Sequence, residues 1–435
     1  MLNRYSAGRC VLVSALMLTA FVPFASAKTL KPEQVLYSFC SRANCSDGSH
    51  SQASLLMDGS GNLYGTTVEG GANVNEAHCS LGCGTVFKLA PDGTETVLYS
   101  FCSQAGCTDG SYPAAGLIED ASGNFYGTTE FGGTGPCTNN SGCGTVFEIA
   151  ADGTESTLYT FCSAANCTDG ANPVGGLVMD GAGNLYGTTE LGGTGTACHP
   201  GCGTIFEISG GTESVLYSFC SEADCADGEQ PEAGLIFDGS GNLYGTTTGG
   251  GISTTCCGTV FEYTSGGTEN VLHAFSATDE GVYPTASLTM DTSGNLYGTT
   301  SDGTVTGVVG AAFELAPDGT ETVLHTFTGG SDGGAPLAGV ILDSSGNLYG
   351  TTSLGGTTGC RKHTGCGTVF KVTPDGTETV LYPFKSQKHG VYPYSGVIAD
   401  SSGNLYGTAF FGGLVKYGSG VVYKINISAT AKTQH

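Results

Sequence analysis

The chain has 435 residues, with 39 acidic residues against 14 lysines and arginines, and a formal net charge of −25 at pH 7. Such a charge repels phosphate, which argues against nucleic acid or an anionic membrane surface as a partner. Glycine supplies 73 residues and interrupts every stretch that could form a helix, so the composition favours an all-β fold over helical repeats.

The first 27 residues have the pattern of a secretory signal peptide. Arg4 and Arg9 give a basic start, 10–24 is an apolar core, and 25–27 offers small residues for cleavage. We therefore expect a mature protein that is secreted or periplasmic, with no membrane span after cleavage. Residues 428–435 are polar and are expected to form a tail.

The rest of the chain is a tandem repeat. The string G-N-[LF]-Y-G-T occurs seven times, at intervals of 52 to 62 residues, and an aspartate stands four positions before each of its asparagines. A second string, L-[YH]-x-F, also occurs seven times. The repeats leave no linker between them, so we expect 28–427 to form one domain.

In chain order, each repeat contains four short candidate strands. In the second repeat these are 115–120, 124–129, 144–149 and 155–161. Turns rich in aspartate and glycine, D-x-[SA]-G-N and A-D-G-T, separate the first two strands and the last two. Four antiparallel strands per repeat are typical of a β-propeller blade.

The two ends of the chain indicate how the ring closes. The mature chain opens with a lone fourth strand at 34–39 and ends with the three strands of the last repeat, SGVIAD, NLYGTA and GVVYKI. Together these four strands complete a seventh blade, so that no sheet edge stays open. We predict an all-β, seven-bladed β-propeller with four antiparallel strands per blade, closed by one N-terminal strand that joins three C-terminal strands.

The repeat motifs resemble those of the GloVer-type (choice-of-anchor) tandem-repeat family of exported bacterial proteins. The resemblance rests on G-N-L-Y-G-T-T, G-G, G-T-V-F-K and P-D-G-T-E-T-V-L-Y-S-F, and it covers most of the chain. It implies an exported repeat protein and supplies no established activity. This chain is expected to lack the C-terminal anchor by which members of the family differ.

Without Cys10 the chain has 18 cysteines, an even number, and export favours their oxidation. The repeats lose cysteines two at a time, which predicts disulfides within single loops. The alternative is zinc, which needs four ligands, and the isolated pair of the sixth repeat cannot supply them. Bonding of the vicinal pair Cys256–Cys257 is left open, because its ring would be strained. The predicted pairs are Cys40–Cys45, Cys79–Cys83, Cys102–Cys107, Cys137–Cys143, Cys162–Cys167, Cys198–Cys202, Cys220–Cys225, Cys256–Cys257 and Cys360–Cys366.

Strand order assigns the connections to two faces of the disc. The connections from strand two to strand three, and from strand four to the next blade, emerge on one face with all the predicted disulfides. We call it the cysteine face, and the opposite face, formed by the short turns, the turn face. Rigid scaffolds usually carry function on variable loops, so the cysteine face is the candidate binding face.

Residues present in all seven repeats are expected to be structural. The tyrosines of G-N-[LF]-Y-G-T are expected to pack between blades rather than to form a carbohydrate platform, and the aspartates before them to cap hairpins. Calcium is the alternative for these aspartates and for four loop acids in turns; no other cofactor or metal is expected. The loop acids are Asp47, Asp109, Asp169 and Asp227.

More than half of the lysine and arginine residues lie after residue 360. Ring closure would bring several of them together on the cysteine face, where they could bind an acidic glycan or a carboxylate. The alternative is that they are scattered solubility charges. This candidate anion-binding patch consists of Arg42, Arg361, Lys362, His363, Lys385, Lys388, His389 and Lys416.

These observations predict a binding or structural interaction module on the cell surface or in the extracellular space. Its expected partner is a glycan, a cell-surface component or a protein, and the chain is expected to be a monomer. The alternative is a lyase or hydrolase acting on an extracellular polysaccharide or small molecule. That enzyme would need a histidine or tyrosine base beside a carboxylate at the mouth of the central channel, and the sequence identifies no catalytic residues.

Overall fold

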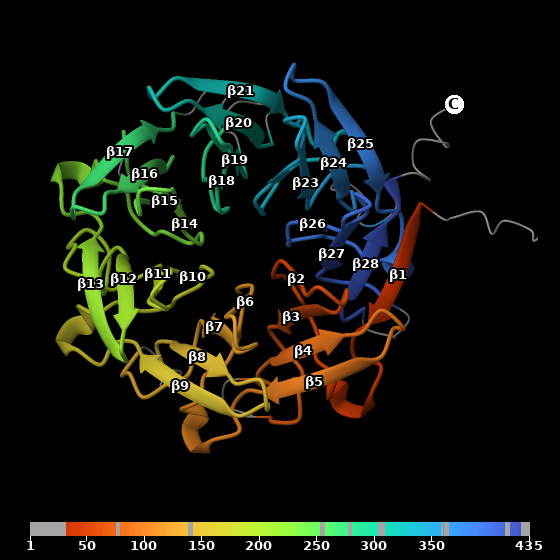
Figure 1. Cartoon of the computed structure of the whole chain (residues 1–435), viewed down its shortest axis with the longest axis horizontal. Coiled ribbons are helices and arrows are strands. Elements are labelled where there is room, and N and C mark those ends of the chain that lie inside the picture. The colour runs from red at the N-terminus through yellow and green to blue at the C-terminus, as the bar shows by residue number, and fades with distance from the viewer. Residues whose placement is uncertain are drawn as a thin grey trace, which may run out of the picture.

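The computed structural model describes residues 32–74, 79–137, 142–252, 257–276, 281–302, 309–357, 360, 365–413 and 418–427. The predicted signal peptide and tail lie outside these residues. The described chain forms seven four-stranded antiparallel sheets arranged as blades of a closed ring (Figure 1). The predicted seven-bladed β-propeller is confirmed.

The inner two strands of each blade come from the segment around G-N-[LF]-Y-G-T. The first strand is two residues long and lies nearest the axis of the ring (Figure 1). The first strands are β2 (Leu56–Met57), β6 (Ile118–Glu119), β10 (Val178–Met179), β14 (Ile236–Phe237), β18 (Thr289–Met290), β22 (Ile341–Leu342) and β26 (Ile398–Ala399). The second strands are β3 (Leu63–Thr67), β7 (Phe125–Thr129), β11 (Leu185–Thr189), β15 (Leu243–Thr247), β19 (Leu296–Thr300), β23 (Leu348–Thr352) and β27 (Leu405–Ala409).

The outer two strands carry the G-T-V-F and L-[YH]-x-F motifs. The third strands are β4 (Thr85–Leu89), β8 (Thr145–Ile149), β12 (Thr204–Ser209), β16 (Thr259–Tyr263), β20 (Ala311–Leu315), β24 (Thr368–Val372) and β28 (Val421–Ile425). The fourth strands are β5 (Glu95–Ser100), β9 (Glu155–Thr160), β13 (Thr212–Ser218), β17 (Glu269–Ala274), β21 (Glu321–Thr326), β25 (Glu378–Pro383) and β1 (Glu33–Ser38). Short 3-10 turns follow five of the fourth strands: η1 (Ala43–Cys45), η2 (Ala105–Cys107), η4 (Ala165–Cys167), η5 (Ala223–Cys225) and η6 (Gln387–His389).

The ring closes through β1, which comes from the N-terminal end of the described chain. It pairs antiparallel with β28, from Glu33 opposite Ile425 to Ser38 opposite Val421. Figure 1 shows β1 on the outer edge of the blade formed by β26, β27 and β28. We number this blade seven, and the others one to six in chain order from β2.

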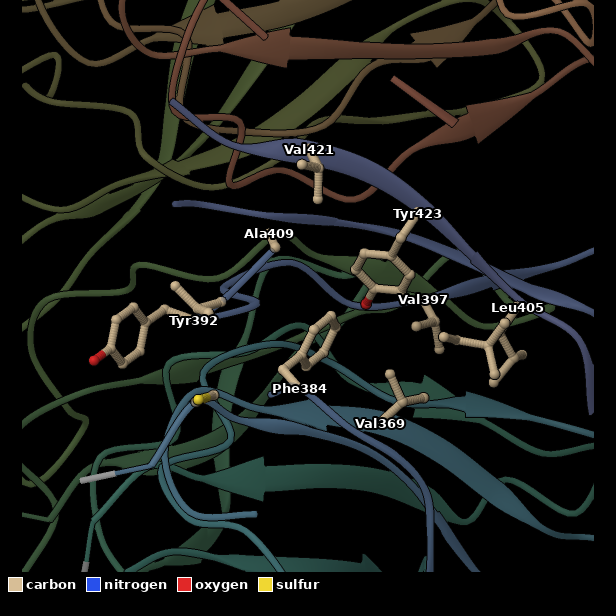
Figure 2. Close-up of a cluster of buried hydrophobic side chains, with 11 residues drawn as sticks. Val369, Phe384, Tyr392, Val397, Leu405, Ala409, Val421 and Tyr423 are labelled. Atoms are coloured by element: carbon tan, nitrogen blue, oxygen red, sulfur yellow. The ribbon is translucent and has the colours of Figure 1, made fainter. Parts of the chain in front are cut away.

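Aromatic side chains hold neighbouring blades together. The phenylalanine of L-[YH]-x-F packs edge-on or tilted against the aromatic residue of the next blade's third strand; Phe384 is edge-on to Tyr423 at 5.2 Å between ring centroids (Figure 2). All these side chains are fully buried. The pairs are Phe39–Phe87, Phe101–Phe147, Phe161–Phe206, Phe219–Phe261, Phe275–Phe313, Phe327–Phe370 and Phe384–Tyr423. Each such contact adds about 0.5–1.5 kcal/mol beyond the area it buries.

The glycine within each second strand makes room for this aromatic residue. Gly245 lies opposite Phe261 in the pairing of β15 with β16. A Cβ atom at Gly245 would lie 2.6 Å from Phe261 Cζ and 2.9 Å from a methyl carbon of Leu235. The glycine of G-N-[LF]-Y-G-T is therefore required by packing.

The turn face is held by the repeated aspartates, as predicted. Asp58 Oδ1 accepts the backbone protons of Ser60 and Asn62 at 2.9 Å, and its Oδ2 accepts protons from the Asn62 amide and the Tyr64 hydroxyl. Tyr64 also packs against Phe125 of the next blade, at 4.5 Å between centroids. The aspartate caps the hairpin and the tyrosine packs between blades, so both sets are structural.

Candidate functional site

Hydrogen bonds between neighbouring blades surround the axis of the propeller. The first threonine after each second-strand glycine donates its hydroxyl proton to a backbone carbonyl just before the next blade's first strand. These bonds fix the segments nearest the axis. The donor–acceptor pairs are Thr66–Ala115, Thr128–Gly175, Thr188–Ala233, Thr246–Ala286, Thr299–Ala338, Thr351–Ser395 and Thr408–Ala53.

The same segments surround a depression of about 470 Å³ on the axis. Each blade contributes three residues that precede its first strand, and Glu130 and Glu190 join them from the ends of second strands. The chain enters first strands and leaves second strands on the cysteine face, so the depression lies on that side, and we call it the channel mouth. Its volume falls within the range of ligand pockets, about 300–1,000 Å³.

Three glutamates from consecutive blades line one side of the channel mouth. Burial and the nearby charges of Glu190 and Glu232 raise the pKa of Glu130 to about 7. Burial and Glu190 likewise raise the pKa of Glu232 to about 7, and burial raises the pKa of Glu190. Glu130 and Glu232 therefore change charge close to neutral pH, where they can both accept and donate protons.

Aromatic residues lie on the other side, where blades seven and one meet. Tyr394 lines the channel mouth and packs against Phe410 at 5.0 Å between ring centroids. Phe410 in turn packs against the imidazole of His50 at 4.7 Å. His50 Nδ1 lies 2.9 Å from Glu69 Oε2. A histidine within hydrogen-bond distance of a carboxylate is thus present two side chains away from the depression.

Hydroxyl groups complete the lining between these two sides. Thr248 lies outside the lining, where it donates to the Gln230 carbonyl at 2.8 Å and its Oγ1 is 3.5 Å from Oε1 of the lining residue Glu232. Thr285 Oγ1 is buried in the lining and has no hydrogen-bond partner among the described residues. Buried hydroxyls usually have a partner, so this group is available to a ligand.

The sequence analysis did not identify these residues. The signal that could have identified them is sequence variation at two positions of the repeat, each of which lies beside positions that are constant. The residue after G-T-T is Val68, Glu130, Glu190, Thr248 or Ser301 in the first five repeats, and Ser353 or, after G-T-A, Phe410 in the last two. The second position holds Gln52, Ala114, Val174, Glu232, Thr285, Leu337 and Tyr394.

The cysteine face also carries the disulfides. Eight of the nine pairs named from the sequence are bonded, each within one loop and four to six residues apart. Cys257 is also disulfide-bonded, and Cys256 lies outside the described residues.

The loop acids organise the loops that follow the fourth strands. Asp109 is fully buried and its Oδ2 accepts protons from the Tyr99 hydroxyl, the Ser103 backbone and the Ser103 hydroxyl at 2.7–3.0 Å. Asp47, Asp169 and Asp227 make the same three contacts. These acids join the loop to its strand, a larger role than the turn formation predicted for them.

The predicted anion-binding patch is described only in part. Arg42 Nη2 lies 2.7 Å from Glu95 Oε2, and His389 Nδ1 lies 2.8 Å from Glu33 Oε2, so both side chains face buried carboxyl groups of a neighbouring blade. Lys385 and Lys388 are exposed in the same connection as His389. The remaining members lie outside the described residues; they are Arg361, Lys362, His363 and Lys416. Binding of an anion by this patch stays a prediction.

A model of the Gloeobacter/Verrucomicrobia repeat matches residues 26–257, 199–360 and 238–435. The chain belongs to this family. The three overlapping matches agree with the tandem repeats that form the blades. No curated protein sequence matches the chain significantly.

Solved structures resemble the chain at low identity. One with a provisional gluconolactonase name shares 15% identity over 65% of this chain and 80% of its own, with a TM-score of 0.36. A luciferin-regenerating enzyme shares 15% sequence identity over 79% of this chain and 96% of its own chain, with a TM-score of 0.41. PorZ, a surface component of the type-IX secretion system of Porphyromonas gingivalis, shares 12% sequence identity over 85% of this chain and 46% of its own chain, with a TM-score of 0.48. These scores support no statement about activity. In the described part of the chain, no helix is long and apolar enough to cross a bilayer.

Proposed function

We propose that this protein is an extracytoplasmic binding module that takes a neutral or amine-bearing glycan at the channel mouth. The observation behind the proposal is the composition of that depression. The strands repeat closely from blade to blade, yet here three carboxyls, the hydroxyl of Thr285, which is unpaired among the described residues, and a tyrosine come together in a volume suited to a small ligand.

The chemistry of the lining favours this ligand class. Carboxyls and threonine hydroxyls accept and donate hydrogen bonds to sugar hydroxyls, while Tyr394 offers an aromatic ring to the apolar face of a sugar. The lining residues are neutral or acidic, so an acidic glycan would meet like charge there. An amine-bearing sugar would meet opposite charge once Glu130 and Glu232 are ionised.

The disulfides support an extracytoplasmic location, because such bonds persist in oxidising compartments. Each bond closes only a short loop. Their main effect is to stiffen the loops of the cysteine face, the face on which the channel mouth opens, and a stiffer face lowers the entropic cost of binding.

A glycan array followed by calorimetric titration tests the proposal. Replacing Glu130, Glu190 and Glu232 together by glutamine, or Tyr394→Ala alone, should weaken binding of the selected glycan at least about tenfold, the equivalent of about 1.4 kcal/mol. The matched control replaces three exposed turn-face acids by asparagine: Asp92, Asp152 and Asp318. Equal loss in both triple variants, or no glycan bound by the unaltered protein, would contradict the proposal.

Catalysis is a second candidate, favoured by the contact between His50 and Glu69 and by carboxyls with pKa near 7 beside the same depression. Screening of extracellular polysaccharides for new reducing ends or unsaturated products tests it. Turnover that is lost in His50→Ala and in Glu130→Gln would establish an enzyme. Binding without turnover would support the binding module instead.

A further inference from the structure

The two disulfides of one blade lie next to each other in blades one, two and three. The first of them is in the connection between strands two and three, and the second follows strand four. In blade one, the sulfur atoms of Cys79, Cys83, Cys102 and Cys107 all lie within 4.8 Å of one another. Blade two has an equivalent group, Cys137, Cys143, Cys162 and Cys167. The two pairs of each group come from different loops, so their adjacency cannot be recognised from the sequence.

Blade three has a variant of the same arrangement. Cys202, Cys220 and Cys225 lie within 4.8 Å of one another and of a carboxylate oxygen of Glu229. Cys198 Sγ is 3.2 Å from Glu229 Oε2. We call the three groups the cysteine quartets, the third being three cysteines and a glutamate.

We propose that the reduced protein binds one thiophilic divalent cation, Zn²⁺ being the test case, in each of the three cysteine quartets. Zinc takes four ligands in a tetrahedron with Zn–S distances of about 2.3 Å, which places the sulfurs about 3.8 Å apart. Four sulfurs already within 4.8 Å need only side-chain rotations to reach that geometry.

Hydrogen bonds hold the scaffold around the quartets in addition to the disulfides. The loop of Cys102 and Cys107 is held by Asp109 and by backbone bonds from Cys102 N to Gly110 O and from Gly133 N to Cys107 O, at 3.2 and 2.9 Å. Cys79, Cys83 and Cys107 are at most 3% exposed. Reduction would therefore leave four thiols gathered in a nearly dry site, where a bound cation is protected from water.

The chemical steps balance. Each protein disulfide takes two electrons and two protons from a dithiol and becomes two thiols. The dithiol itself leaves as a cyclic disulfide. Zn²⁺ then replaces thiol protons and binds the thiolates. Because a sulfur in a disulfide is no longer a thiolate ligand, the oxidised and metal-bound forms exclude each other. Thiol–disulfide exchange with an added disulfide, which takes the two electrons and leaves as two thiols, therefore releases the cation.

Isolated pairs in other blades provide internal controls. Cys40–Cys45 in blade seven and Cys360–Cys366 in blade six lie outside the three quartets. A general affinity of cysteine pairs for zinc would involve these pairs as well, whereas a quartet site would not.

The test uses the mature protein, reduced with dithiothreitol and freed of it by gel filtration under argon. Zn²⁺ is titrated against a chromophoric chelator, and Co²⁺ is used to detect tetrahedral thiolate ligation by its absorption bands. We expect three tight equivalents in the reduced protein and none in the oxidised protein. The third equivalent should be the weakest, because a carboxylate replaces one thiolate.

Two matched variants locate the sites. The double variant Cys79→Ser/Cys83→Ser should bind two tight equivalents, while Cys40→Ser/Cys45→Ser should still bind three. Circular dichroism with and without metal follows the fold. The proposal is overturned if the reduced protein binds no metal tightly, or if both variants lose metal equally, as they would if an unfolded reduced chain bound zinc through any of its cysteines.

Discussion

At the scale of single residues, the repeated glycines and aromatic rings form one unit that recurs between all neighbouring blades. The ring of a third strand lies on the glycine of the second strand and receives the edge of a phenylalanine from the preceding blade. No larger residue fits under the ring, since interiors are close-packed. The invariance of this glycine among the repeats thus has a steric cause.

Gly245→Ala should destabilise the protein by about 1–3 kcal/mol, because the added methyl group overpacks the site against Phe261 and Leu235. Urea unfolding, followed by circular dichroism, measures the change. Gly239→Ala in the same blade is the control, since a Cβ atom there meets nothing within 4 Å and its backbone is not left-handed. Equal stability of the two variants would show that the ring can shift at no cost.

At the scale of elements, turn chemistry and the repeat made the strands predictable, and the offset of the two ends predicted the closure. The sequence could not show which loops meet across blades. Arg42 pairs with Glu95, 53 positions away, and the glutamates of the channel mouth come from three different repeats. Repeat positions are visible in a sequence, whereas contacts around a ring depend on how blades pack.

The split blade should be the main device that locks the ring. The described ends are adjacent, since Asn426 N donates to Pro32 O at 2.8 Å. Two circular permutants can therefore join these ends and reopen blade five at new points. Opening between Asp318 and Gly319 again splits a blade, and the thermal midpoint should stay close to that of the natural chain. Opening between Gly329 and Gly330 leaves every blade whole, removes the strand that joins the ends, and should lower the midpoint by several degrees. Equal midpoints would contradict this role of closure.

At the scale of the whole molecule, negative charge is concentrated on a compact disc, and part of it is buried. Burial raises to about 7 the pKa of six glutamates, which occupy the channel mouth or the first or second position of fourth strands. They are Glu95, Glu130, Glu213, Glu232, Glu269 and Glu378. In contrast, hydrogen bonds lower the pKa of the turn-face aspartates, including Asp58 and Asp238, although burial opposes this.

These opposite shifts predict a stability maximum in mildly acidic solution. Between the unfolded-state pKa of about 4.5 for a glutamate and its folded-state pKa of about 7, the folded protein binds more protons than the unfolded chain, so stability falls as the pH rises through this window. Below about pH 4 the aspartates, whose folded-state pKa is depressed, bind more protons in the unfolded chain, so stability falls again as the pH decreases. Calorimetry from pH 3 to 8 should therefore show the highest thermal midpoint at about pH 4–5.

Replacing glutamates with raised pKa should flatten the neutral side of that profile. Glu213→Gln combined with Glu269→Gln removes two carboxyls whose ionisation in the folded protein lowers its stability. The thermal midpoint of the double variant should therefore decline less between pH 5 and 7 than that of the natural chain. Glu119→Gln is the control, because this side chain is exposed at the end of β6. A midpoint that rises from pH 5 to 7 in the natural chain, or an equal slope in the double variant and the natural chain, would show that these carboxyls do not set the pH dependence. The remaining slope would then reflect the repulsion within a chain of net charge −25.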